Sequence, residues 1–278
     1  MTEHENVILI TGATSGLGRY LAQRLATRET TLLIHGRDPL RTKELAESIG
    51  ARYYVADLAS LAEVRALARQ VRTDNDKLTL LINNAGVGGG SDPSKRELSA
   101  DGHELRFAVN YLAPYVLTRA LLPSLRAGAS KTCSQGRAST LSRVVNVGSA
   151  GQSPIDFDDL RMDRGYDGFT AYCRSKLALA MFTFDLAGEL DGAGVTANVL
   201  HPATFMDTAM VRASGITPVN TIEHGGQATL RVALEFDGVT GQYFDEDRPA
   251  RAHPDAYDPA KRTRLRELTE ELLASSVG

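Results

Sequence analysis

A tyrosine and a lysine four residues apart, Tyr172 and Lys176, are the residues of this sequence with the most specific chemistry. Side chains at i and i+4 of a helix share one face, so a phenol and an ammonium would be neighbours here. A free phenol titrates near about 10, and a nearby cation favours its ionised form, which suits a tyrosine that transfers a proton near neutral pH. Such pairs also occur by chance on helix surfaces, so the spacing alone does not assign a role.

Two further polar residues fit the same chemistry. Ser149 follows an apolar run, and ligands of open α/β sheets bind beyond the carboxyl ends of strands, where its hydroxyl could hold a carbonyl oxygen. Asn110 stands in a helical pattern although asparagine is a poor helix former, and its carbonyl or amide could hold a water that relays protons from Lys176. A structural Asn110 that merely bends the helix explains the position equally well.

A glycine-rich turn near the start of the chain predicts a phosphate site. The apolar residues 7–10 are followed by glycines at 12, 16 and 18 and then by a helical pattern. A strand, turn and helix in this order direct backbone N–H groups at one point, and the glycines leave room for a pyrophosphate. A tight turn without a ligand is the alternative, because glycine makes up 25 of the 278 residues.

Strands and helices alternate along the whole chain, which requires crossover connections and a parallel sheet. We predict strands at 7–10, 31–35, 52–56, 78–82, 143–148, 195–200 and 241–244, and helices at 19–28, 39–49, 61–71, 101–126, 171–190, 222–235 and 259–274. The fold class is therefore α/β, a doubly wound Rossmann-type parallel sheet of about seven strands with helices on both faces. Residues 1–278 are expected to form one domain, with 127–140 as a surface excursion without chemistry.

Composition narrows the classes of partner. The net charge is −3 and the basic residues are scattered, so neither nucleic acid nor an anionic membrane is an expected partner. The first strand begins almost at the N-terminus and no apolar run could span a bilayer, which predicts a cytoplasmic protein without a signal peptide or anchor. Cys133 and Cys173 belong to no pairing motif, so we expect neither a disulfide nor a metal site.

Taken together, these motifs resemble the short-chain dehydrogenase/reductase family from end to end. Thr11, Gly12, Gly16 and Gly18 match its T-G-x-x-x-G-x-G, residues 83–86 match its N-N-A-G, and Asn110, Ser149, Tyr172 and Lys176 match its catalytic tetrad. The stretches 101–115 and 171–178 resemble the branch that contains retinol dehydrogenases and WW-domain oxidoreductase.

This resemblance implies an NAD(P)-dependent enzyme that interconverts a carbonyl and an alcohol. Tyr172 would give a proton to the carbonyl oxygen, Ser149 would hold that oxygen, and Lys176 would lower the tyrosine pKa and bind the nicotinamide ribose. The cofactor-binding residues expected are Thr11, Gly12, Ser15, Gly16, Leu17, Gly18, Arg37, Asp57, Leu58, Asn83, Ala85, Gly86, Tyr172, Lys176, Pro202 and Thr204.

Arg37 predicts NADPH rather than NADH. In this kind of fold an acid at the end of the second strand binds a free ribose 2′-hydroxyl, whereas an arginine offers a planar fork of donors to a 2′-phosphate. Asp38 could take the ribose instead, but Pro39 after it favours a helix cap. Asp57 and Leu58 are expected at the adenine edge, as in the family. NADPH in turn favours carbonyl reduction.

Two departures from the family pattern bear on the substrate side. The hydrophobic N-terminal anchor that animal retinol dehydrogenases usually carry is missing from this sequence, which puts a membrane-dissolved retinoid in doubt. Where the family reads P-G-x-V-x-T, residues 202–208 read P-A-T-F-M-D-T. Either Thr204 or Thr208 is therefore the candidate for contact with the nicotinamide amide.

Apolar residues in the segments 150–170 and 203–222 predict a lipophilic ketone, aldehyde or secondary alcohol as substrate. These residues are Ile155, Phe157, Phe169, Phe205, Met206 and Met210. Some of them could equally well be ordinary residues of the hydrophobic core.

Association is also expected, because helices 101–126 and 171–190 commonly pair with their copies in the family. The second helix would have more apolar surface than one core needs, which predicts a homodimer or homotetramer. The residues concerned are Leu177, Ala178, Met181, Phe182 and Phe184.

Two other functions share the fold. A sugar-nucleotide epimerase or dehydratase would need a longer region after residue 200, and an NAD(P)-binding sensor would not need the tetrad.

Overall fold

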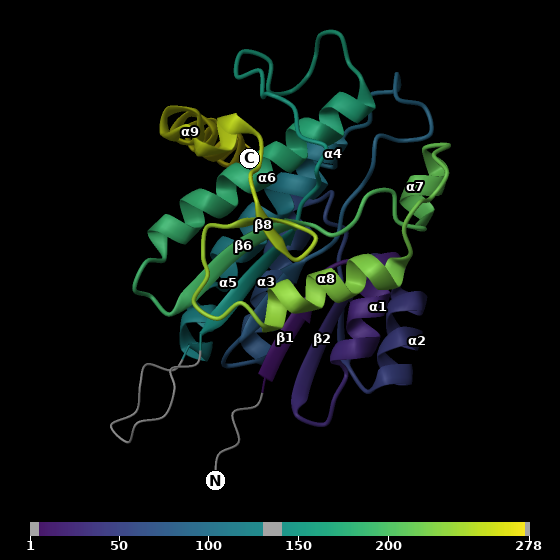
Figure 1. The fold of residues 1–278 in the computed structure, drawn as a ribbon, viewed down its shortest axis with the longest axis vertical. Coiled ribbons are helices and arrows are strands. Elements are labelled where there is room, and N and C mark those ends of the chain that lie inside the picture. The colour runs from purple at the N-terminus through teal and green to yellow at the C-terminus, as the bar shows by residue number, and fades with distance from the viewer. Residues whose placement is uncertain (1–5, 130–140, 276–278) are drawn as a thin grey trace.

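The computed structural model describes residues 6–129 and 141–275, and its centre is one sheet of eight strands in the order β3-β2-β1-β4-β5-β6-β7-β8 (Figure 1). The strands are β1 Asn6–Ile10, β2 Thr30–Gly36, β3 Arg52–Val55, β4 Leu80–Asn83, β5 Ser142–Val147, β6 Val195–His201, β7 Tyr243–Asp245 and β8 Arg248–Ala250. All neighbours pair in parallel except β7 and β8. The predicted doubly wound α/β fold is confirmed, and the short edge strand β8, which contains Pro249, is the strand that the sequence pattern did not predict.

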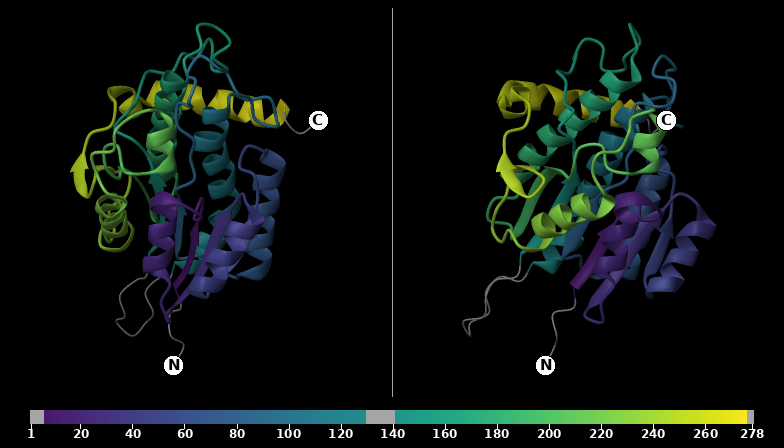
Figure 2. Two further views of the ribbon diagram at one scale, coloured as in Figure 1. Left: turned by 90° about the vertical axis from the view of Figure 1, so that its right-hand side faces the viewer. Right: turned by 45° about the vertical axis from the view of Figure 1, so that its right-hand side comes forward.

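Helices cover both faces of this sheet (Figures 1 and 2). One layer consists of α1 Gly16–Leu25, α2 Pro39–Ile49 and α8 Ile222–Leu234, and the other of α3 Leu61–Asp74, α5 Ala113–Gly128 and α6 Gly168–Glu189. Outside these layers lie α7 Ala209–Ala213, the 3₁₀ turn η2 Pro254–Tyr257 and α9 Pro259–Ser275. Alternate residues of each central strand face opposite layers, as Leu9 and Ile10 of β1 do, so the strands are apolar on both sides.

The helix predicted at 101–126 starts later and is not regular. Residues 101–104 form a turn in which Gly102 has a φ of +78°, and Glu104 caps the helix by accepting from the Phe107 N–H. The helix then runs from α4 Leu105–Phe107 through one π turn, η1 Ala108–Leu112, into α5. The irregular turn is therefore centred on Asn110, and Pro114 lies in the first turn of α5. Of the predicted surface excursion at 127–140, residues 130–140 lie outside the described residues.

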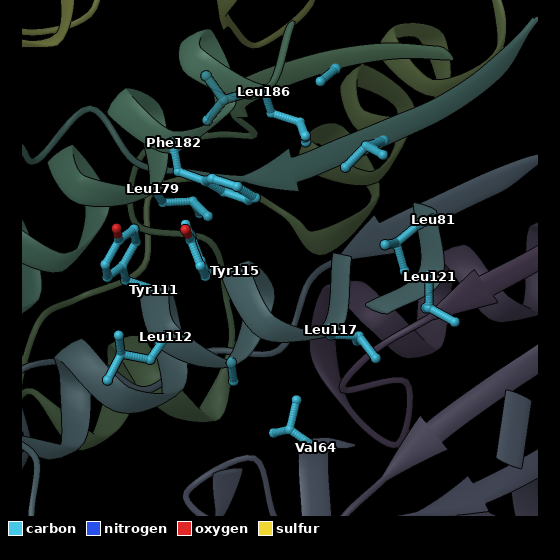
Figure 3. Packing of buried hydrophobic residues seen from close by; sticks show 14 of the residues in the cluster. Val64, Leu81, Tyr111, Leu112, Tyr115, Leu117, Leu121, Leu179, Phe182 and Leu186 are labelled. Carbon is cyan, nitrogen blue, oxygen red and sulfur yellow. The ribbon is translucent and has the colours of Figure 1, made fainter. Parts of the chain in front are cut away.

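The apolar residues of α6 that supported an oligomer are covered by the chain itself. Leu177, Ala178, Met181 and Phe182 are buried, and Phe184 packs on Tyr257 with ring centroids 5.0 Å apart. Figure 3 shows Phe182 and Leu179 of α6 beside Tyr115 of α5. Asp185 on the outer side of α6 pairs with Arg262 and Arg266 of α9 at 2.6 and 3.1 Å. The apolar residues of α6 therefore no longer support a homodimer or homotetramer, which stays a prediction from the resemblance to the family.

A buried hydroxyl pair joins α9 to the π turn that carries Asn110. The Tyr111 hydroxyl lies 2.7 Å from Thr269 Oγ1, and Thr269 donates its own hydrogen to the Leu265 carbonyl. Tyr111 must then be the donor to Thr269. We expect Tyr111→Phe to lower the free energy of unfolding by about 1 kcal/mol, measured by urea denaturation, because one buried hydrogen bond is lost.

Tyr53→Phe is the matched control, since Tyr53 is 43% exposed. In a Thr269→Val background, where the tyrosine hydroxyl has already lost its acceptor, Tyr111→Phe should cost much less. Equal losses in both backgrounds would contradict the assignment.

Candidate active site

The sequence-predicted site residues gather at the carboxyl edge of the sheet, around a cleft of about 670 Å³. A cleft of this size suits a cofactor together with a small molecule. Of the predicted catalytic and cofactor residues, Gly12, Ser15, Gly16, Leu17, Gly18, Arg37, Asp57, Leu58, Ala85, Gly86, Ser149, Tyr172, Lys176, Pro202 and Thr204 line it. Thr11, Asn83 and Asn110 do not.

The glycine turn has the shape that a pyrophosphate needs. Gly12 and Gly16 have φ angles of +66° and +51°, and a Cβ on Gly18 would lie 2.2 Å from the Gly12 carbonyl oxygen. The Ser15 side chain makes no capping hydrogen bond at the start of α1, so it does not occupy the backbone donors of that first turn. These features fit a dinucleotide phosphate held at the helix N-terminus.

Thr11 and Asn83 support the cleft from behind. The Thr11 hydroxyl accepts hydrogen bonds from the N–H groups of Asn84 and Ala85, both at 3.1 Å. Asn83 points toward α5, where its amide donates to Thr118 Oγ1 at 2.9 Å and to Asn146 Oδ1 at 2.8 Å. Their placement makes them positioning residues of the β4 turn and does not support direct cofactor contact.

His35 is a cleft residue that sequence reasoning missed. Its Nδ1 accepts from the Gly12 N–H at 3.3 Å, which leaves the proton on Nε2 to donate to the Ala56 carbonyl at 3.0 Å. Burial lowers the pKa of His35, so the ring is neutral and can keep that acceptor. The sequence did contain a signal for this role, because His35 is a polar residue in a part of the strand that is otherwise buried and apolar.

The ends of β5 and α6 bring Ser149, Tyr172 and Lys176 together. The Ser149 hydroxyl oxygen accepts from the Gly151 N–H at 3.0 Å, so its own hydrogen is available to donate, and Tyr172 lines the same part of the cleft. The Lys176 ammonium donates to the Val147 carbonyl at 2.8 Å and lies 5.7 Å from the centroid of the Tyr172 ring. Two hydroxyl donors and one buried cation therefore lie at one end of the cleft.

Burial dominates the electrostatics of this trio. It raises the pKa of Tyr172 above its usual value, although the hydrogen bond with Ser149 acts in the opposite direction. It also lowers the pKa of Lys176 to about 8. Desolvation of the phenolate is the largest cause of the raised pKa of Tyr172, and the expected lowering of the tyrosine pKa by Lys176 stays a prediction. Tyr172 thus keeps its proton at neutral pH, as a proton donor must.

The Asn110 side chain makes three hydrogen bonds within the chain. Its Oδ1 accepts from the Val87 N–H at 2.8 Å, and its amide donates to the Val87 carbonyl at 3.0 Å and to Ser175 Oγ at 2.9 Å. Both N–H groups of the amide are used, so a relay water would have to bind a carbonyl oxygen, and the relay role of Asn110 stays a prediction. The side chain anchors the loop after β4 to α6.

Arg37 and Asp57 line the end of the cleft where adenosine is expected, and Asp38 follows Arg37 in the chain. Asp38 caps α2, as predicted, by accepting from the N–H groups of Leu40 and Arg41 at 2.9 and 3.1 Å. Asp57 accepts from the Ala59 N–H at 3.0 Å within its own turn. In the described part of the chain the Arg37 guanidinium has neither a hydrogen bond nor an ion pair, so it is free to bind an anion.

The segment after β6 forms the remaining wall. Thr204 lies with its hydroxyl 3.0 Å from His201 Nε2, while Thr208 caps α7 and its methyl group faces Gly16. Both line the cleft, so the choice between them as nicotinamide contact stays open.

The predicted apolar wall is only partly at the cleft. The residues that line it are Phe169, Phe205, Met206 and Met210. Ile155 is buried in the core, and Phe157 packs against that core.

No helix within residues 6–129 and 141–275 combines the length and apolar character needed to cross a bilayer.

Comparison with known proteins agrees with this geometry. A family model described as short chain dehydrogenase matches residues 6–217. Among curated proteins, retinol dehydrogenase 13 of Homo sapiens is 33% identical, over 93% of this chain and 81% of its own length. Polyprenol dehydrogenase of Mus musculus is 35% identical over the same shares, 93% and 81%.

Solved structures include one from Mycobacterium paratuberculosis, an uncharacterised protein with a TM-score of 0.77 and 28% identity, over 97% of this chain and 94% of that one. The RhlG/NADP active-site complex of Pseudomonas aeruginosa has a TM-score of 0.65 and 26% identity, over 88% and 97%. The chain therefore belongs to the short-chain dehydrogenase family, in its retinol dehydrogenase-like branch, and is an NAD(P)-dependent oxidoreductase of CH–OH and C=O groups.

Proposed function

We propose that this protein reduces the carbonyl group of a lipophilic small molecule with NADPH. The observation that carries the proposal is the convergence of the Tyr172 and Ser149 hydroxyls at one end of a cleft whose outer wall is apolar. The names of two relatives, a retinol dehydrogenase and a polyprenol dehydrogenase, indicate lipophilic alcohols as their substrates, which supports the same class here.

The residues of the cleft would share the work of a carbonyl reduction. The Ser149 hydrogen, not needed for its bond with Gly151, would bind the substrate oxygen and polarise the carbonyl. Tyr172, whose pKa is raised by burial, would donate its proton to that oxygen. The buried Lys176 would stabilise the phenolate that remains. When bound, NADPH supplies the hydride that reduces the carbonyl carbon.

The preference for NADPH is supported by the different states of Arg37 and Asp38. Asp38 is occupied as the cap of α2, so it is not available to bind a ribose hydroxyl. Arg37 lines the cleft at the end of β2, where a 2′-phosphate would meet a planar fork of donors. The related RhlG structure is a complex with NADP, which agrees with this choice.

A substrate panel tests the proposed reaction directly. Oxidation of NADPH, followed by absorbance, should be faster with bulky apolar ketones and aldehydes than with small charged carbonyl acids. Tyr172→Phe should lower kcat by at least about a hundredfold and leave NADPH affinity close to that of the wild type, because only the transferable proton is removed.

Tyr53→Phe, far from the cleft, should leave kcat unchanged. Faster turnover of the small acids would overturn the lipophilic substrate class. A Tyr172→Phe enzyme that kept a tenth of the wild-type rate would overturn the assigned acid.

The cofactor preference is tested by Arg37→Ala. A charge-assisted contact to a phosphate contributes about 1.5–3 kcal/mol, so the ratio of kcat/KM for NADPH to that for NADH should fall tenfold to over a hundredfold. Arg69→Ala on the exposed side of α3 is the matched control and should keep the wild-type ratio. A wild type that prefers NADH, or an unchanged ratio in Arg37→Ala, would remove Arg37 from this role.

A further inference from the structure

A buried arginine outside the catalytic tetrad clamps the wall of the cleft. Arg106, in α4, is 1% exposed, and its Nε donates to the Gly88 carbonyl at 3.0 Å while Nη2 donates to the Gly89 carbonyl at 3.2 Å. Four residues later, Asn110 binds both the N–H and the carbonyl of Val87. One face of this helical stretch therefore holds three consecutive backbone units of the loop after β4.

The clamp is itself fixed by charge. Arg106 Nη2 pairs with Glu97 at 2.8 Å and Nη1 with Glu104 at 3.4 Å, and Glu104 is 1% exposed. The Tyr166 hydroxyl donates to Glu104 at 2.9 Å and accepts from Arg106 at 3.0 Å. A cation with all of its donors used in this way cannot change its orientation without leaving a buried charge unpaired.

The clamped glycines touch both sides of the substrate end of the cleft. Gly88 and Gly89 line it, and a Cβ on Gly88 would lie 2.8 Å from Met210 Cγ in α7. The Gly89 carbonyl oxygen is so close to the first residue of α6 that a Cβ on Gly168 would lie 2.2 Å from it. Tyr172 is four residues further along that helix, so a shift of this loop would move the wall that faces the proton donor.

We propose that Arg106 is a positioning residue that holds the loop at residues 87–89 in place and thereby determines how tightly the carbonyl substrate is bound. The inference rests on the proposed function for its substrate. A preformed wall raises affinity because the loop does not have to be ordered again on binding. Cofactor affinity should depend on it much less, since Arg106 binds the backbone of Gly88 and Gly89 and contacts neither the glycine turn nor Arg37.

The experiment compares Arg106→Lys and Arg106→Gln with Arg119→Lys. Lysine keeps the charge beside Glu104 but cannot span two carbonyls, whereas Arg119 is an arginine of α5 that pairs with Glu189 away from the cleft. For both Arg106 variants we expect KM for the carbonyl substrate to rise tenfold or more, kcat to change less than threefold, and the NADPH Kd from fluorescence titration to stay within twofold. Arg119→Lys should change none of these.

Amide hydrogen exchange of residues 86–95 gives a readout that does not need turnover. Exchange there should be at least tenfold faster in Arg106→Lys than in the wild type, with the rest of the cleft unaltered. If Arg106→Gln does not fold, Arg106→Lys alone is used for both measurements. An unchanged KM or unchanged exchange in Arg106→Lys, or an NADPH Kd that rises as much as KM, would overturn the proposal. A wild type that reduces no carbonyl would refute the proposed function, and the exchange and NADPH titrations would still decide the role of Arg106.

Discussion

The close approach between the turn after β1 and the turn after β4 is the constraint on which the cleft depends. A Cβ on Gly12 would lie 2.7 Å from the Ala85 Cα, so only glycine lets the two strand ends meet. Thr11 and Asn84 then bind across the gap, with Asn84 Nδ2 donating to the carbonyls of Thr11 and Gly12 at 2.9 and 3.1 Å. The carbonyl of Gly12 in turn contacts Gly18 of α1. The phosphate turn and the loop that faces the substrate are thus parts of one packed unit.

Around that unit, two buried cations bind backbone carbonyls. Lys176 donates to the Val147 carbonyl at the end of β5, and Arg106 donates to two carbonyls of the loop after β4. Moving a cation out of water costs free energy, and hydrogen bonds to carbonyl groups offset part of that cost. The same hydrogen bonds hold the backbone segments that carry these carbonyls in place. The lowered pKa of Lys176 shows that this offset is incomplete.

Sequence patterns were sufficient for the parts of the site that local geometry dictates. The glycine spacing, the Tyr172 and Lys176 pair and the Asp38 cap depend on near neighbours in the chain, and the structure places all of them at the cleft or its edge. The roles of Asn83, Asn110 and Arg106 depend on partners as far as 65 residues away, such as Gly88 and Ser175, and no local pattern gives the direction of such a side chain. The same holds for the raised pKa of Tyr172, which follows from burial and not from the spacing of Lys176.

Helix α6 shows how far an apolar pattern can be interpreted. A helix that is apolar on nearly every side must be covered on every side, and in this respect the sequence prediction was correct. The pattern does not say which element provides the cover. Here η2 and α9 return across α6, and Tyr257, Arg262 and Arg266 make the contacts that we had expected from a second copy. Because α9 also binds Tyr111 beside Asn110, the C-terminal helix is attached to the same helical stretch that clamps the cleft wall, so its packing and the geometry of the site are mechanically connected.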